Sequence, residues 1–205
     1  MADHYAFARL THNSNGWIKP SGWAHKSPNK RTFEADYGFG FEEWLFNSDY
    51  SIDDYQYGYV ESLRADRQQH PLALYTFKYA ANRRGKAERI LVATIDKWEH
   101  IDMWGNATVD DQIIAWCDTM VNDVINILGN DTPERQSTMQ INLHAQYPEG
   151  HTKPLKNIRF KLNKDNVNYL YDKNIDVSPV IKTGFFVTQV RSRKEIHSNI
   201  LNILR

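Results

Sequence analysis

The residues best suited to recognition chemistry lie in the run YGFGFEEWLF, from Tyr37 to Phe46. This run belongs to a longer stretch, Phe33–Tyr59, in which ten of 27 residues are aromatic. Two glycines interrupt its start, and two adjacent carboxylates, Glu42 and Glu43, occupy its middle. Aromatic faces beside hydrogen-bond acceptors suit a flat polar group such as a nucleobase, because rings stack on the base while acceptors read its edge. The pattern therefore favours a base-binding site.

The candidate base-binding residues combine this run with nearby aromatic side chains. They are Trp17, Trp23, Tyr37, Phe39, Glu42, Glu43, Tyr57 and Tyr59. Trp44 and Phe46 are expected in the core, whereas Trp17 and Trp23, in the polar loop of residues 12–32, are candidates for a stacking wall. Because consecutive residues point in different directions, Glu42 and Glu43 are not expected to form an acid/base pair. One of them faces a pocket while the other faces solvent or pairs with a lysine, or both are surface acids near a helix start.

Basic residues gather in three segments of a chain whose formal net charge is zero. Residues 11–31 carry four Lys or Arg and no acid, residues 75–89 carry five and one Glu, and residues 151–161 carry four and no acid. Such segregation is compatible with one basic face on a neutral protein, or with scattered solvated charge. The candidate phosphate-binding residues are Lys19, Lys26, Lys30, Arg31, Arg83, Arg84 and Lys86.

No catalytic or cofactor motif accompanies these candidates. The chain has no Walker A loop, no G-x-G-x-x-G after a strand, no H-E-x-x-H and no G-x-S-x-G. Its single cysteine, Cys117, argues against a structural zinc site and is expected to be a packing residue. We therefore expect no catalytic residue, no metal and no cofactor. The sequence contains no long apolar span or secretory signal, so a cytoplasmic location without a membrane partner is expected.

The elements that must position these residues are strands first and helices later. Alternation predicts strands at residues 5–10, 55–60, 71–79 and 89–95, the last three as an antiparallel meander. Residues 42–46 fit a helical turn or a short strand. Thr108 and Asp111 open a helix that Gly129 ends. Further strands are expected at 137–145, 158–162 and 184–190, a short helix or turn at 166–170, and a final helix opened by Ser192 and Glu195.

This order predicts an α+β fold, with a strongly curved, mostly antiparallel sheet or small barrel and two or three helices. The chain is expected to form a single domain over residues 1–205, with a possible C-terminal subregion from about residue 130.

Three motifs together resemble a segment of prokaryotic proteins associated with HNH nucleases and modification-dependent restriction. They are PSG at residues 20–22, the run from Tyr37 to Asn47, and YQYGY at residues 55–59. The common form of the central motif is G-F-G-H-E-E-W-L-F; Phe41 stands in place of its histidine, so no role that needs the imidazole carries over. The resemblance covers roughly the first 60 to 100 residues.

The resemblance implies a reader of modified DNA with a PUA-, EVE- or SRA-like domain. Such readers flip a marked base into an aromatic pocket, and an effector nuclease acts with them. The first hypothesis is therefore a DNA-binding reader of modified bases in prokaryotic defence, with duplex DNA as its partner. The second is a metal-dependent nuclease of unrecognised pattern that uses carboxylates among Glu34, Asp36, Glu42 and Glu43. The third is a protein-interaction or small-ligand module whose aromatic residues form the core.

Overall fold

The computed structural model describes residues 3–29, 32–61, 63–80, 86–101, 107–128, 156–181, 188–196 and 198–204. The strands are β1 (His4–Leu10), β2 (Ser51–Ile52), β3 (Tyr55–Gly58), β4 (Leu72–Lys78), β5 (Glu88–Ile95), β6 (Glu99–His100), β7 (Ile158–Lys161), β8 (Val167–Tyr169) and β9 (Gln189–Ser192). The α-helices are α1 (Phe33–Tyr37), α2 (Ala107–Leu128) and α4 (Ser198–Ile203). Short 3-10 helices are η1 (Phe41–Trp44), η2 (Ala65–Arg67) and η3 (Tyr171–Lys173).

The larger sheet has five strands in the order β8-β5-β4-β1-β9. β1 runs parallel to β4, and the other neighbours are antiparallel, so the sheet is mixed. All residues of β1 after His4 are buried. Their side chains alternate between two clusters, since Ala6, Ala8 and Leu10 join one and Tyr5 and Phe7 the other. A strand buried on both faces is expected to be apolar almost throughout, as β1 is.

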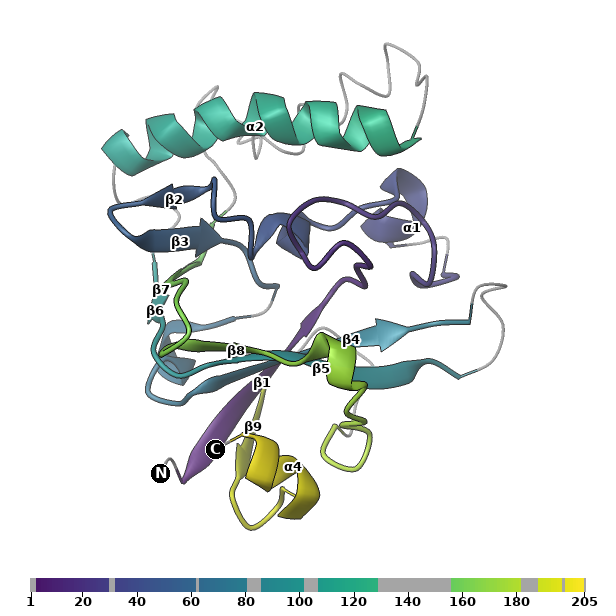
Figure 1. The fold of residues 1–205 in the computed structure, drawn as a ribbon, viewed down its shortest axis with the longest axis vertical. Coiled ribbons are helices and arrows are strands. Elements are labelled where there is room, and N and C mark those ends of the chain that lie inside the picture. Colours follow the sequence, from purple (N-terminus) through teal and green to yellow (C-terminus); the bar gives the residue numbers. More distant parts are fainter. Residues whose placement is uncertain are drawn as a thin grey trace.

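The smaller sheet has four strands in the order β2-β3-β7-β6, all antiparallel. In Figure 1 it lies between α2 and the five-stranded sheet, whereas α4 lies on the far side of the larger sheet. Ile196, Ile200 and Leu204, in and beside α4, pack on the Tyr5 and Phe7 face. The molecule is therefore layered, with α2, the small sheet, the large sheet and α4 in succession.

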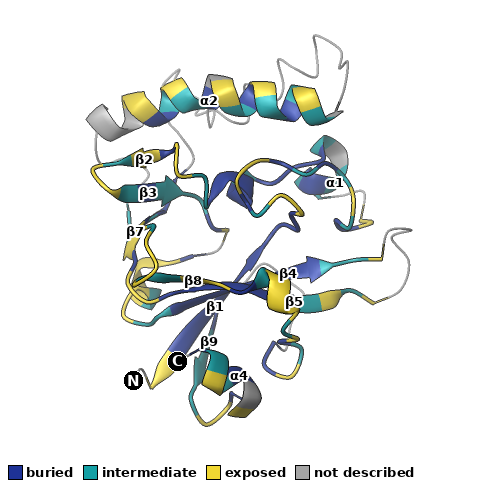
Figure 2. Cartoon of the chain, in the orientation of Figure 1, coloured by how far each residue is buried: buried dark blue, intermediate teal, exposed yellow. Residues whose placement is uncertain are grey.

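The core is divided into three apolar clusters, visible as buried segments in Figure 2. One lies between the sheets and contains Trp17, Leu45 and Phe160. The second lies under α4, and the third joins Phe39, Trp44 and Tyr50 to the buried face of α2. The aromatic run from Tyr37 to Phe46 thus supplies side chains to two of the three clusters.

Several sequence predictions are confirmed by the structure. The strands expected at 5–10, 71–79, 89–95 and 158–162 correspond to β1, β4, β5 and β7, and the long helix ends at Leu128. Residues 41–44 form a 3-10 helix, so the segment is a helical turn rather than a short strand. The class is α+β with two sheets and few helices, although the described residues form no closed barrel.

Three predictions about elements were wrong. β3 does not join β4 and β5 in a meander, because its partner is β7 in the other sheet, about 100 residues away in the chain. Residues 167–169 form strand β8 rather than a helix, since they pair with Ile95, Thr94 and Ala93. Ser192 closes β9 instead of capping a helix, although its N–H and hydroxyl both donate to Glu195. The strand expected at 137–145 and much of that at 184–190 lie outside the described residues.

Candidate functional site

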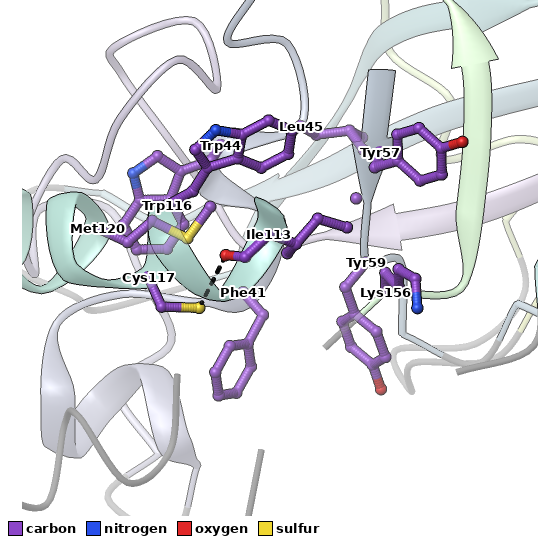
Figure 3. Close-up of a pocket in the computed structure, with 11 residues that line it drawn as sticks. Phe41, Trp44, Leu45, Tyr57, Tyr59, Ile113, Trp116, Cys117, Met120 and Lys156 are labelled. Atoms are coloured by element: carbon purple, nitrogen blue, oxygen red, sulfur yellow. Dashed lines mark hydrogen bonds between the residues drawn. The ribbon is translucent and has the colours of Figure 1, made fainter. Parts of the chain in front are cut away.

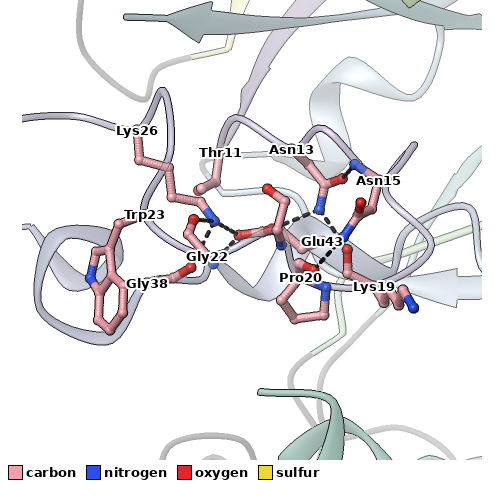
Figure 4. A network of polar contacts seen from close by, with 12 residues as sticks. Thr11, Asn13, Asn15, Lys19, Pro20, Gly22, Trp23, Lys26, Gly38 and Glu43 are labelled. Carbon is pink, nitrogen blue, oxygen red and sulfur yellow. Dashed lines mark hydrogen bonds and ion pairs between the residues drawn. The ribbon is translucent and has the colours of Figure 1, made fainter. Parts of the chain in front are cut away.

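Glu43 is completely buried and forms an ion pair with Lys26 at 2.6 Å. Lys26 also donates to the carbonyl oxygens of Gly22, at 2.5 Å, and Gly38, at 2.7 Å, so its three protons all have acceptors. Figure 4 shows this ammonium between the polar loop and the start of η1. Lys26 was predicted to bind phosphate; its 1% exposure and its three acceptors place it in the interior instead.

Both carboxylate oxygens of Glu43 accept hydrogen bonds. Its Oε1 accepts from the Gly40 N–H, at 2.9 Å, and its Oε2 accepts from Asn13 Nδ2, at 2.6 Å, and the Ser21 N–H, at 3.0 Å. Burial raises the pKa of Glu43 and lowers the pKa of Lys26, while their mutual attraction opposes both shifts. This pair holds the loop to η1; it presents no acceptor to a ligand.

Glu42 is also buried but faces different groups. Burial raises the pKa of Glu42 to about 7; a hydrogen bond from Thr11 lowers it, and the charges of Glu61 and Glu34 raise it further. Glu34 lies 3.9 Å from the Arg9 guanidinium, which covers the Phe77 ring at 4.4 Å. The two consecutive acids therefore diverge, as their spacing predicts, and neither belongs to a carboxylate dyad with the other.

The two loop tryptophans are held in place by their indole N–H groups. Trp17 is completely buried, donates to the Thr11 carbonyl at 3.0 Å, and packs edge-on against Tyr171. Trp23 is half-buried and donates to the Ala35 carbonyl at 3.1 Å. A base therefore cannot stack on Trp17 in this conformation, which corrects the stacking role predicted for it.

The aromatic residues of the run pack mainly on one another. Phe33 stacks on Tyr37 and on Phe41, with ring centroids 4.5 and 5.0 Å apart, and meets Phe39 edge-on. Phe39 is fully buried, and Tyr37 is half-buried. These side chains form a packed aromatic cluster, and Tyr37 and Phe39, predicted to bind a base, are parts of it.

A small pocket opens beside this cluster, between η1, β3 and α2 (Figure 3). Phe41, Trp44, Tyr57 and Tyr59 line one side, and Ile113, Trp116, Cys117 and Met120 of α2 line the other. Its volume is about 30 Å³, the space of one water molecule. Of the predicted base-binding residues, the structure brings only Tyr57 and Tyr59 to this pocket.

Two of the three basic segments meet at one end of the larger sheet. Tyr79, just after β4, donates its N–H to the His25 carbonyl, and the His25 ring contacts the Tyr79 carbonyl at 2.7 Å. Next to this contact, Lys78, Lys86 and Arg89 line a groove of about 690 Å³, together with the acids Glu88 and Asp176. The third segment lies elsewhere: Arg159 binds Glu99, and both Arg159 and Lys161 cover Tyr55.

The remaining phosphate candidates fall into two groups. Lys19 is exposed on the polar loop, and Lys86 lines the groove. Lys30, Arg31, Arg83 and Arg84 lie outside the described residues.

The described residues include no group of three or more His, Cys, Asp or Glu that could hold a metal ion. Of the carboxylates considered for a metal-dependent nuclease, Glu34 faces Arg9 and Glu43 faces Lys26; the side chain of Asp36 lies outside the described residues. Within the described part of the chain, no helix has the length and apolar character needed to cross a membrane.

Sequence reasoning missed the α2 side of the pocket. Ile113, Trp116 and Met120 recur at helical spacing in the helix expected between Thr108 and Gly129, and Cys117 was expected to be a packing residue. Their proximity to Tyr57 and Tyr59 depends on how α2 docks, and no local signal encodes it. Lys78 and Arg89 were counted in a basic segment, but only strand pairing brings them to one groove.

In comparisons with known proteins, no protein-family model, curated protein or solved structure matches the chain.

Proposed function

We propose that this protein binds duplex DNA and reads a modified base. The observation that carries the proposal is a groove at the β4–β5 end of the sheet, lined by three cations of the basic segment 75–89 and by the acids Glu88 and Asp176. There Lys78, Lys86 and Arg89 line the groove, and Tyr79, next to Lys78 in the chain, contacts His25 of the loop. Cationic side chains along a groove neutralise phosphates and supply the sequence-independent part of DNA affinity.

The aromatic pocket supports the base-reading half of the proposal. Phe41, Trp44, Tyr57 and Tyr59 offer ring surfaces in one place, and the stacking of an extruded base on such rings offsets the cost of unpairing it. The groove and the pocket have no residue in common, so phosphate binding and base reading can be tested separately.

The biological setting rests on the motif resemblance. In this setting the chain is the cytoplasmic recognition module of a prokaryotic restriction system, and an effector nuclease cuts the marked DNA. The same proposal includes that the two sheets form a PUA-, EVE- or SRA-like domain.

The test measures affinity for labelled duplexes of one sequence that are plain or carry 5-methylcytosine, 5-hydroxymethylcytosine or N6-methyladenine. We expect one modified duplex to bind more tightly than the plain one. Lys78→Glu with Lys86→Glu should weaken binding of every duplex about tenfold or more, because each change places a negative charge in the groove. Fluorescence anisotropy at fixed salt gives the dissociation constants.

The matched control moves the same charge change to the other end of β5. Lys97→Glu with Lys164→Glu alters two exposed lysines outside the groove and should change affinity much less. Equal losses in both double variants would remove the groove from the interface. Magnesium-dependent cutting of any duplex would instead support the nuclease hypothesis.

Protein interaction is a second candidate function, favoured by a separate observation. Ile18 and Tyr169, exposed by 51% and 38%, are the large hydrophobic side chains that stand out on the described surface. Both line an apolar groove of about 360 Å³ with Phe46, Leu162 and Val167. Two exposed apolar side chains that share a groove offer a partner protein an apolar contact surface. Failure to bind any duplex in the test above would favour this candidate.

A further inference from the structure

We infer that helix α2 is a lid whose displacement opens the aromatic pocket to a planar base. This inference rests on the proposed base-reading function and adds how the site is opened. The closed pocket holds about 30 Å³, whereas small-molecule sites typically need several hundred. A base can enter only if one wall moves.

The wall formed by η1 and β3 is firmly held. β3 is paired with β7 along its whole length, and η1 is attached to the polar loop through Glu43 and its donors. The Phe46 N–H, just after η1, also donates to the Trp17 carbonyl at 2.9 Å. Moving this wall would break sheet hydrogen bonds and a buried ion pair together.

The α2 wall is held by side chains. Val121 and Val124 pack into the cluster of Phe39, Trp44 and Tyr50, and Trp116 lies 5.2 Å from the Tyr50 ring. Trp44 Nε1 donates to Asp123 Oδ2 at 2.9 Å across the same interface. A helix keeps its own backbone hydrogen bonds when it moves as a unit, so its displacement exposes apolar side chains without breaking a sheet.

Opening would uncover the same surfaces that a base needs. Trp44 and Phe41 come from η1, Trp116 from α2 and Tyr59 from the segment just after β3, and all four line the pocket (Figure 3). Separation of α2 would expose these rings together, and a base bound between them would restore part of the apolar packing that α2 provides in the closed form.

Cys117 gives a direct readout of the lid. It is the single cysteine in the chain, lies in the α2 wall, and is 2% exposed. A thiol reagent therefore reaches it only when α2 opens or the whole protein unfolds. We expect native protein to react with dithiobis(nitrobenzoic acid) faster than global unfolding allows, at a rate that changes little with low urea concentrations.

One variant weakens the attachment of the lid and another controls for the change in the helix. Asp123→Ala removes the acceptor of Trp44 and should speed labelling about tenfold. Asn122→Ala also truncates a polar side chain, at the neighbouring exposed position of α2, and should leave the rate within about twofold of wild type. Labelling that follows global unfolding in rate and urea dependence, in all three proteins, would overturn the lid.

Duplex DNA then separates the lid from its ligand. A duplex whose modified base enters the pocket should change the Cys117 labelling rate several-fold, while a plain duplex of the same sequence should not. If α2 opens but no duplex changes the rate, the lid stands and its assignment to a nucleobase fails. If modified DNA binds tightly while labelling stays coupled to global unfolding, base reading survives and the lid is wrong.

Discussion

Glu42 and Glu43 are adjacent in the chain, but their carboxylates contact different groups. Glu43 receives Lys26, two backbone N–H groups and Asn13, which together satisfy a buried charge. Glu42 accepts a hydrogen bond from Thr11, while the charges of Glu61 and Glu34 raise its pKa further. Burial raises the pKa of both carboxyls, that of Glu42 to about 7.

The raised pKa of Glu42 predicts how stability depends on pH. A folded-state pKa of about 7 against an ordinary 4.5 means that the folded protein holds the Glu42 proton more tightly than the unfolded chain. Stability from this group is therefore complete below about pH 4.5 and falls as pH rises to about 7. Glu42→Gln should remove the contribution of this group to that slope and increase the free energy of unfolding at pH 8 by up to about 3 kcal/mol.

Urea unfolding at pH 5 and pH 8 measures this effect. The change in stability between the two pH values should be smaller in Glu42→Gln than in wild type. Glu88→Gln, an exposed carboxylate on β5, should keep the wild-type difference. If Glu42→Gln and wild type lose equal stability between pH 5 and pH 8, the buried carboxylate is not the source of the dependence.

At the scale of elements, the polar loop between β1 and α1 is built as a fixed part of the fold. The buried Trp17 side chain attaches the loop to the core. The Asn13 side chain accepts from the Asn15 N–H within the loop and donates to Glu43. Lys26 donates to the carbonyl oxygens of Gly22 and Gly38. Gly38, with φ 72°, ends α1 in a left-handed conformation and directs its carbonyl to Lys26. The loop and the aromatic run therefore form one unit.

Lys26→Met should loosen this unit. Removing one partner of a buried pair leaves the Glu43 charge uncompensated, which costs about 3–5 kcal/mol. We expect a matching loss in the free energy of unfolding by urea and faster chymotrypsin cleavage beside Trp17 and Trp23. Lys19→Met, an exposed lysine of the same loop, is the control and should change neither. An unchanged cleavage rate in Lys26→Met would mean that the ion pair does not hold the loop.

At the scale of the whole molecule, the described part of this neutral chain presents a groove lined by Lys78, Lys86 and Arg89 together with the acids Glu88 and Asp176. Two of its basic segments meet at the β4–β5 end, while Arg159 and Lys161 of the third lie against Tyr55 in the other sheet. Among the described residues, the cations of segments 75–89 and 151–161 therefore lie in different places, and Lys26 of segment 11–31 is buried.

The salt dependence of DNA binding tests this arrangement. Arg83→Ala with Arg84→Ala should weaken binding to all sequences and reduce the slope of log K against log salt by about 0.9 for each phosphate that the variant no longer neutralises. These two residues belong to the segment that joins β4 to β5. An unchanged slope would exclude that segment from the interface, whatever the affinity.

The sequence by itself determined the elements whose patterns are local. Alternation marked β1, β4, β5 and β7, and the 3.6-residue period with its start and stop signals marked α2. It also indicated that Glu42 and Glu43 diverge, because the geometry of one peptide step requires it. Trp44 was expected in the core for its size and is 3% exposed.

Only the tertiary structure decided what these elements meet. The pairing of β3 with β7, the burial of Lys26 and Trp17, and the position of α2 over Tyr57 and Tyr59 all join residues distant in the chain. Periodicity shows which face of an element is apolar, but it cannot show which other face covers it. In the sequence, a lysine near tryptophans predicts a nucleic-acid contact. In the structure, this lysine, Lys26, instead pairs with the buried carboxylate of Glu43 at 2.6 Å.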